Sequence, residues 1–292
     1  MRRGTLNDNK DAIATFAFRQ NWLLDGLGNW AGFDEDLDGG GGSGWDLEQT
    51  RAHSDANEIT STTETTGSAW AGTDHDAAGN MVEMPRADDP TDGVEAVYDA
   101  WNRLVELIDE STQDTLAKYQ WDGMGRRIVV EVYDEGDPDE TRHYYTQQHQ
   151  IVEVRVDGTS SSDLAEQYVW GAPGRYVDEL ILRDRDTTGN GELNERLYAL
   201  QDTNFNVVAI VDDDGSVQER YRYAPHGQRT VLNANFSAHP NPHHGGHSFG
   251  FGFRGLMHDD DPGGLLYHRA GMMMKNLAKI QTCIPSISGS FL

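Results

Sequence analysis

The sequence predicts an all-β protein built from repeated antiparallel hairpins. A turn motif recurs, in which an aromatic residue or His is followed by Asp, two further residues, Gly or Asn, and then alternating apolar residues. Segments rich in β-branched residues alternate with these turns, and helical periodicity is weak throughout. Aromatic residues are spread along the chain, with 7 Trp, 11 Tyr and 9 Phe, and they supply surface for sheets to bury.

The turn motif returns at a constant spacing in the first half of the chain. Its aspartates Asp76, Asp99 and Asp122 lie 23 residues apart, with a related copy at Asp25 and a later one in which Ala224 replaces Asp. The Asp side chain can accept hydrogen bonds from the backbone two residues on, and the following Gly or Asn takes the positive φ that closes the turn. We therefore expect each copy to join two strands of a hairpin.

Strand patterns follow these turns and are strongest between residues 167 and 232. Alternating apolar and polar residues, many of them β-branched or aromatic, predict strands at 104–107, 127–132, 167–170, 176–182, 197–200, 207–211 and 217–223. Stretches rich in Gly, Pro, His or Asp predict loops at 39–44, 134–139 and 239–247. The expected architecture is a meander of short antiparallel strands.

Composition excludes several classes of partner. The 292-residue chain has 23 Lys and Arg against 49 Asp and Glu, a net charge of −26, which would repel nucleic acid and anionic membrane surfaces. The sequence contains no apolar run long enough to predict membrane insertion, and its N-terminus does not resemble an ordinary secretory signal. We therefore expect either a cytoplasmic protein or the end of a longer secreted chain. The single cysteine, Cys283, excludes an intrachain disulfide.

From about Trp22 to Ala270 the ordered motifs resemble the YD-repeat family, and the second half resembles the RHS-repeat-associated core. The matching stretches are YVWG at 168–171, YVDE at 176–179, LRDRD at 182–186, LQDTN at 200–204, VAIVD at 208–212, ERYRY at 219–223, FGFRG at 251–255 and DPGGLLYHRA at 261–270. The resemblance implies a fragment of a large secreted or surface protein, such as bacterial wall-associated proteins, polymorphic toxins and teneurins. Their repeats wind as a long β-sheet into a hollow shell.

The resemblance also implies a division of the chain. We expect an N-terminal partial repeat region at 1–70 with an acidic Gly-rich loop, YD repeats at 71–160, and a core-like region at 161–270. Residues 271–292 fit no part of the pattern, which a frameshift or truncation would explain, and we expect them to be disordered. In toxin members the core ends in an aspartyl self-cleavage signature. Asp261–Leu265 looks like that signature but lies in an earlier context, so we interpret it as a decoy.

The first functional hypothesis is a structural and binding module that is not an enzyme. The alternative is part of a self-cleaving toxin-delivery shell that lacks its cleavage site and toxin, and a third is a degraded gene remnant. Carbohydrate or an encapsulated polypeptide is the expected partner, because some family members are connected with carbohydrate binding and toxin members enclose a toxin.

One acidic loop has the spacing of a calcium site, and calcium is the cofactor that we consider for this chain. Asp184, Asp186, Glu192 and Glu195 occupy ligand positions one, three, nine and twelve of a twelve-residue loop whose sixth residue is Gly189. Hard cations need several oxygens converging from a tight loop. The alternative is a solvated acidic hairpin loop. The acidic run at 34–39 matches only the first half of such a loop.

Histidines and aspartates suggest two further sites with weaker patterns. Four histidines of the loop at 239–247 carry imidazoles that can bind a transition metal: His239, His243, His244 and His247. Their Pro- and Gly-rich setting offers no rigid frame and favours a mobile polar loop. His258 precedes the acidic run at 259–261, where acid–base chemistry would need a buried carboxylate pair. An acidic turn is the favoured interpretation there.

Overall fold

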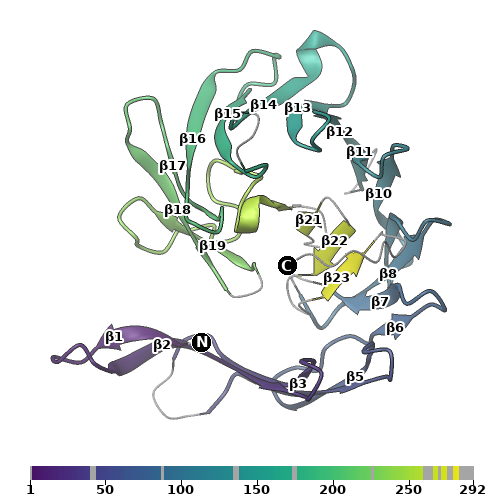
Figure 1. The fold of residues 1–292 in the computed structure, drawn as a ribbon, viewed down its shortest axis with the longest axis vertical. Coiled ribbons are helices and arrows are strands. Elements are labelled where there is room, and N and C mark those ends of the chain that lie inside the picture. Colours follow the sequence, from purple (N-terminus) through teal and green to yellow (C-terminus); the bar gives the residue numbers. More distant parts are fainter. Residues whose placement is uncertain are drawn as a thin grey trace. The chain divides into compact units, whose positions relative to one another are not determined.

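The computed structural model describes residues 2–39, 44–86, 89–133, 138–172, 176–224 and 227–258, together with strands at 266–268, 271–274 and 279–282. Within these residues the chain consists of antiparallel strands and two 3-10 segments, with no α-helix, so the all-β prediction is confirmed (Figure 1). The chain forms two compact units. Unit 1 comprises Met1–Ala96 with Glu110–Thr112, and unit 2 comprises Val97–Asp109 with Gln113–Leu292. The division predicted from the repeats stays a prediction.

Unit 1 contains a five-stranded antiparallel sheet in sequence order. Its strands are β1 (Arg2–Leu6), β2 (Ile13–Leu24), β3 (Trp30–Asp36), β4 (Leu47–His53) and β5 (Ile59–Thr66). Three further strands follow: β6 (Asp74–His75), β7 (Met81–Pro85) and β8 (Gly93–Tyr98), the last of which runs two residues past the unit boundary. Arg51 is buried in this unit among the rings of Trp30, Phe33 and Trp70, and burial lowers its pKa to about 10.

Unit 2 contains a long antiparallel meander, coloured teal to green in Figure 1. Each of its strands pairs with the next along the chain: β9 (Leu104–Asp109), β10 (Thr115–Trp121), β11 (Arg127–Val132), β12 (Asp139–Tyr145), β13 (Ile151–Val156), β14 (Leu164–Trp170), β15 (Leu180–Arg185), β16 (Glu195–Gln201), β17 (Val207–Val211), β18 (Val217–Tyr223) and β19 (Arg229–Asn233). A 3-10 turn, η1 (Ser161–Asp163), precedes β14. Every connection in this sheet is local, as a meander of hairpins requires.

The C-terminal part of unit 2 begins with a second 3-10 segment, η2 (Phe253–Gly255). A four-stranded antiparallel sheet follows, in the order β20 (Met257–His258), β21 (Leu266–His268), β22 (Gly271–Met274) and β23 (Lys279–Thr282). The stretch expected to be disordered therefore contains β22 and β23. Cys283 and the cleavage-like Asp261–Leu265 lie outside the described residues.

The strand predictions are confirmed in position for β9, β11, β14, β16, β17 and β18. The expected strand at 176–182 is wrong in its first half, because β15 begins only at Leu180. Residue Glu179 donates its backbone N–H to the Tyr176 carbonyl at 3.2 Å, which makes a turn where a strand was expected. The YVDE stretch alternates like a strand, but this hydrogen bond takes the place of ladder pairing.

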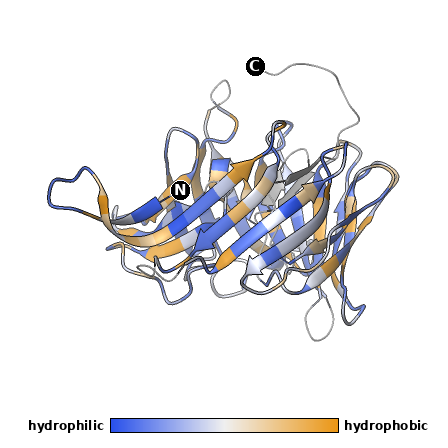
Figure 2. Cartoon of the chain, turned by 90° about the horizontal axis from the view of Figure 1, so that it is seen from below, coloured by the Kyte–Doolittle hydropathy of each residue, from blue (hydrophilic) through white to orange (hydrophobic). Residues whose placement is uncertain are grey.

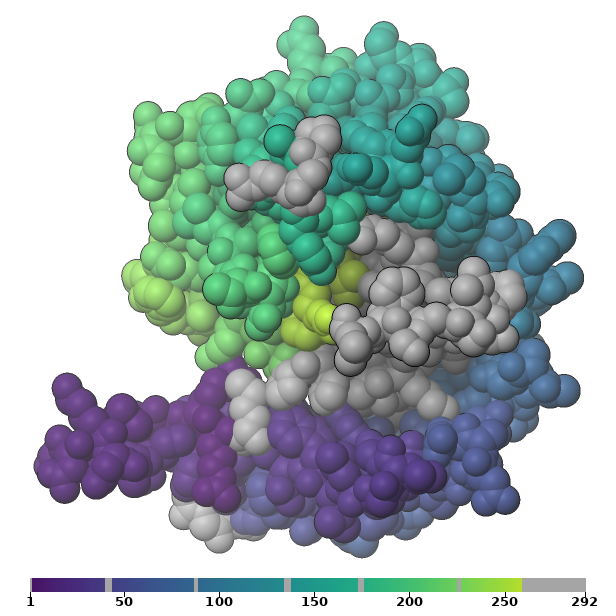
Figure 3. Space-filling view, viewed as in Figure 1, coloured from purple at the N-terminus to yellow at the C-terminus, as the bar shows by residue number. Residues whose placement is uncertain are grey.

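Alternation along the strands builds the core, and Figure 2 shows hydrophilic and hydrophobic residues interspersed across the sheets. The main apolar cluster of unit 2 gathers residues from β13 to β19 and from the segment that follows: Ile151, Val154, Tyr168, Leu180, Leu197, Val207, Ile210, Tyr221, Val231, Phe249 and Phe251. Phe249 and Phe251 come from outside the meander. In the space-filling view, yellow-green residues near position 250 lie against green residues of unit 2 (Figure 3).

Candidate functional site

The recurring turn motif works through its aspartate, as predicted. The Asp122 carboxylate accepts the backbone N–H groups of Met124 at 2.8 Å and Arg126 at 2.9 Å, while Gly125 adopts a φ of 76°. The Arg126 side chain returns to the same carboxylate, with its Nε 2.6 Å away. Burial opposes ionisation of Asp122, but these hydrogen bonds outweigh it and lower the pKa of the carboxyl below its ordinary value.

The arginine at the end of the motif also joins one turn to the next. Arg103 donates to the carbonyl of Asp122 at 3.1 Å, and Arg126 donates to the carbonyl of Thr146 at 3.3 Å. Each arginine therefore closes its own turn and binds the backbone of the following one. In the Asp25 copy the shorter Asn29 makes the corresponding contact with the side chain of Asn57, at 3.0 Å.

The aromatic residue before the turn has a role that the sequence analysis missed. Its polar atom donates to a backbone carbonyl at the start of the preceding strand in four hairpins, namely Trp121 to Leu104 at 2.7 Å, Tyr145 to Arg127 at 2.6 Å, Trp170 to Ile151 at 2.6 Å and Tyr223 to Val207 at 2.7 Å. The contact requires a donor, so Tyr and Trp serve and Phe would not, and at the end of β16 the Gln201 amide donates to the Asp178 carbonyl at 2.9 Å. The absence of Phe before these turns was the available signal.

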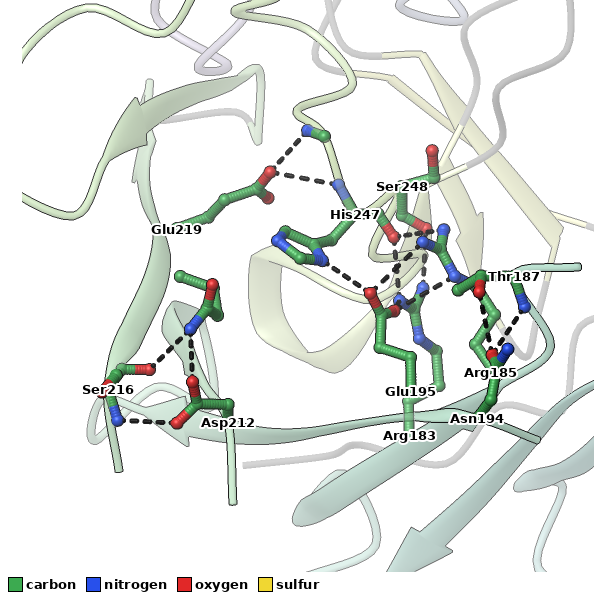
Figure 4. A network of polar contacts seen from close by, with 12 residues as sticks. Arg183, Arg185, Thr187, Asn194, Glu195, Asp212, Ser216, Glu219, His247 and Ser248 are labelled. Carbon is green, nitrogen blue, oxygen red and sulfur yellow. Dashed lines mark hydrogen bonds and ion pairs between the residues drawn. The ribbon is translucent and has the colours of Figure 1, made fainter. Parts of the chain in front are cut away.

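A buried charge network lies on the sheet where residues 239–251 cross it. We call these residues the internal segment. Arg183 is completely buried on β15 and forms ion pairs with Glu166 at 3.1 Å and Glu195 at 2.9 Å. The same guanidinium donates to the carbonyls of His247 at 2.8 Å and Ser248 at 2.9 Å (Figure 4). One cation thus binds two carboxylates of the sheet and two carbonyls of the internal segment.

Two further arginines bind the same backbone. Arg185 donates to the His247 carbonyl at 2.7 Å, and the buried Arg229 donates to the Phe249 carbonyl at 2.6 Å. A weaker bond of 3.4 Å joins Arg229 to the His243 carbonyl. Arginines from β15 and β19 therefore hold the internal segment by its main chain.

A carboxylate binds the backbone N–H groups of the internal segment. Glu219 on β18, only 2% exposed, accepts from Gly246 at 2.5 Å and from His247 at 3.1 Å. The Tyr221 hydroxyl also donates to Glu219, at 2.7 Å. Glu219 and Tyr221 are two residues apart on β18 and therefore lie on the same face of the sheet. The face that carries the aromatic core thus also carries this charge. A charged residue at an inward strand position was the signal that could have identified it.

The charges of the network keep one another ionised. Burial alone would lower the pKa of Arg183, but the carboxylates of Glu166 and Glu195 outweigh burial and raise that pKa. Burial would raise the pKa of Glu195, but its hydrogen bond with His247 and the two nearby arginines bring it below the ordinary value. Arg183 and Glu195 are therefore both charged at neutral pH.

Aromatic packing completes the site. The Phe251 ring meets Tyr168 edge-on, with 4.9 Å between centroids, and meets Trp170 in the same way at 5.1 Å. The Arg183 guanidinium lies over the Phe249 ring at 5.0 Å. The sheet thus contacts the internal segment, whose residues 242–247 form turns, through donors for its carbonyls, an acceptor for its N–H groups and ring contacts to two phenylalanines.

The structure does not gather the four residues of the predicted calcium site into one cluster. Asp184 forms a bidentate pair with Arg196, with both contacts at 2.7 Å, and Glu195 belongs to the Arg183 network. Asp186 accepts backbone N–H groups of its own loop, and Glu192 is exposed. Three of the carboxylates thus have hydrogen-bonded partners within the protein. Calcium binding at this loop stays a prediction.

Among the described residues, three acidic side chains come close enough to share an ion: Asp36, Asp38 and Asp46. Two of them belong to the acidic run at 34–39. Asp36 is buried, pairs with Arg19 and accepts the Gly39 N–H at 2.5 Å, while Asp46 accepts the Leu37 N–H at 2.8 Å. These bonds shape the loop, and the sequence spacing did not anticipate the part played by Asp46.

The four histidines do not form a metal cluster in the part of the chain that is described. His247 Nδ1 lies 2.8 Å from Glu195, and His239 Nε2 lies 4.0 Å from Glu219. The expectation of a mobile loop without a frame is wrong, because arginines and Glu219 from distant strands supply that frame. His258 is buried and its Nε2 accepts the Phe253 N–H at 3.2 Å, whereas Asp259–Asp261 lie outside the described residues.

No protein-family model and no curated protein matches the sequence. Among solved structures, the chain is similar to the Tc holotoxin pore of Photorhabdus luminescens with a mutated TccC3, at 10% identity and a TM-score of 0.36, covering 93% of this chain and 17% of that chain. It is also similar to a crystal structure of TcdB2-TccC3-TEV, at 9% identity and a TM-score of 0.35, covering 92% of this chain and 17% of that chain. Within the described residues, no helix is long and apolar enough to cross a membrane.

Proposed function

We propose that this chain is a non-catalytic segment of an RHS-type, YD-repeat shell protein, and that its sheet binds polypeptide through main-chain groups. The observation that carries the proposal is the Arg183 network, in which a fully buried cation binds two main-chain carbonyls of the internal segment. Recognition through the main chain accepts many sequences, because every residue has a carbonyl. A shell that encloses a variable polypeptide needs this property.

The repeat chemistry supports the family part of the proposal. The evenly spaced aspartates each organise a turn, and the arginines at the ends of the motifs join successive turns. A sheet built this way extends by adding hairpins, each of which contacts its neighbours. Cell-surface or wall association, and secretion of a longer chain, follow from the resemblance of the ordered motifs between Trp22 and Ala270.

We propose polypeptide rather than carbohydrate as the partner. The charged donors and acceptors of the covered sheet face bind backbone groups of the internal segment, and Tyr168 and Trp170 pack against Phe251, so the contacts made by this face are contacts to polypeptide. Nucleic acid is disfavoured as a partner by the net charge of −26.

The test is protection of a polypeptide joined to the full chain after Leu292. A Gly/Ser-rich segment with several lysines should be cut by trypsin more slowly when fused than when free. Arg183→Met should reduce the protection by loosening the covered face, and Arg196→Met, which removes an exposed arginine of a neighbouring strand, should not. Equal cleavage of the fused and the free segment would refute the enclosing role.

The self-cleaving alternative makes a different prediction. If the decoy interpretation of Asp261–Leu265 is right, full-length protein stays at its intact mass on long incubation. Scission at Leu265, abolished by Asp261→Asn, would favour the toxin-delivery alternative and would replace the non-catalytic proposal.

A further inference from the structure

The loop between β15 and β16 contains an Asn-Gly pair, Asn190-Gly191. In such a pair the Gly backbone nitrogen, once deprotonated, can attack the Asn side-chain carbonyl carbon. A C–N bond forms, the C–N bond to the amide breaks, and ammonia leaves with the proton, which yields a five-membered succinimide. Water then opens the ring to Asp or isoaspartate. Asn190 is exposed, so water reaches it freely.

The two reacting groups are both engaged in hydrogen bonds. The nucleophile, Gly191 N, donates its proton to the Asp186 carboxylate at 2.6 Å. The electrophile is held as well, because Asn190 Oδ1 accepts the Glu192 N–H at 2.9 Å. Neither group can reorient toward the other without losing its partner.

Packing restrains the backbone at the same place. Gly191 has a φ of 81°, and a Cβ there would lie 2.5 Å from the Ser161 carbonyl oxygen and 2.8 Å from the Ser162 Cα. The Gly191 backbone therefore lies directly against the η1 turn. A glycine is required at this position, so the loop keeps the residue type that makes deamidation fastest, and the contact restricts the rotation that the reaction needs.

We propose that Asn190 is a deamidation site whose reaction is held back by the Asp186 carboxylate. Attack requires a negative charge on Gly191 N, and a second negative charge 2.6 Å away opposes it. The carboxylate also accepts the Thr188 and Gly189 N–H groups, which fix its position. These bonds lower the pKa of Asp186 to about 2, so the carboxylate is ionised wherever deamidation runs at neutral pH.

Deamidation would act on the Arg183 network, which holds the internal segment. The loop connects Arg185 to Glu195, both of which belong to the Arg183 network. Isoaspartate adds one backbone atom between these residues, and either product adds a carboxylate to a loop that already contains Asp186 and Glu192. We therefore expect the modified chain to hold the internal segment less well.

The experiment follows Asn190 by intact mass and peptide mapping at neutral pH and 37 °C in the full chain. The folded parent should deamidate at Asn190 at least about tenfold more slowly than the same chain in denaturant, since a like charge shifts ionisation by about one pK unit or more. Asp186→Ala should approach the denatured rate, and Asp186→Asn, which keeps an acceptor oxygen but removes the charge, should fall between. Asn190→Gln should abolish the signal.

Asp184→Asn is the matched control, because it neutralises a loop carboxylate that pairs with Arg196 instead of Gly191 N. It should deamidate at the parent rate. Equal rates in the folded and the denatured parent would overturn the proposal. So would an unchanged rate in Asp186→Ala that retains its β circular dichroism, or a parent-like rate in Asp186→Asn, which would leave no role for the charge.

Discussion

The acidic loop at 184–195 and the internal segment at 239–251 both have the composition of a metal site, but they are organised in opposite ways. The acidic loop is shaped mainly by its own residues, since Asp186 accepts N–H groups within five positions of itself and Asn194 accepts the Thr187 N–H at 3.0 Å. The internal segment is held by residues 11 to 65 positions earlier, among them Arg183 and Arg229. The first region is a local structure, and the second exists only in the folded sheet.

The largest expected effect is a loss of stability when Arg183 is replaced, because the internal segment then loses its contacts with this side chain. Arg183→Met takes the cation from Glu166 and the Ser248 carbonyl and leaves Glu195 and the His247 carbonyl with Arg185 as their cation, and removing one partner of a buried ion pair costs about 3 to 5 kcal/mol. Urea unfolding should show this loss. Arg196→Met, which breaks only an exposed pair, should leave stability nearly unchanged. Equal destabilisation by both variants would remove the distinction between the two regions.

A buried histidine in the first half of the meander should make the stability of the protein depend on pH, because its tertiary environment lowers its pKa. His143 is buried, and desolvation together with the neighbouring Arg127 lowers its pKa to about 3. Its unfolded pKa is near 6.5, so the unfolded chain takes up a proton first as the pH falls. The stability contributed by His143 is complete above about pH 6.5 and decreases toward pH 3, by about 2 kcal/mol at pH 5.

Urea unfolding at several pH values measures this effect, and His143→Leu should flatten the dependence between pH 6.5 and 4. A slope that the substitution leaves unchanged would assign the acid sensitivity to other groups.

The hydrogen bond of the aromatic residue before a turn should have an intermediate effect, because its partner lies one strand away. Tyr145→Phe removes the donor to the Arg127 carbonyl and should cost about 1 kcal/mol. Tyr144→Phe is the control, since Tyr144 is the adjacent residue and is 39% exposed. Thermal unfolding of the two variants should separate them, and identical melting temperatures would show that the position needs only a ring.

The smallest expected effect concerns calcium and the acidic loop. Extracellular calcium modules bind with Kd of roughly 0.1 to 1 mM, so millimolar calcium should raise Tm by a few degrees at most, and more than magnesium does. Asp184→Asn with Glu192→Gln should remove the rise while sparing the Glu195 network. A rise that is equal for both ions and survives in the variant would be general screening, and the loop would then be an acidic turn stabilised by its own hydrogen bonds.

The fold was predictable from the sequence where the residues of a single hairpin determine the conformation of that hairpin. Asp122 and Gly125 specify a turn because acceptor, donors and positive φ lie within five residues, and alternation at 127–132 places β11 correctly. The strand expected at 176–179 was wrong because the alternation there is overruled by a backbone bond between Glu179 and Tyr176. For the candidate site, spacing identified a loop at 184–195 but not the partners of its carboxylates.

By itself the sequence determined the all-β class, the repeating turns and most strand positions, because these depend on side-chain alternation and on hydrogen bonds between near neighbours. Only the tertiary structure decided which charges are buried together. Arg183, Glu219 and Arg229 come from three different strands and meet the internal segment only after the sheet has formed. A buried charge is tolerated when partners converge on it from several directions, and that convergence is a property of folded geometry that no local pattern contains.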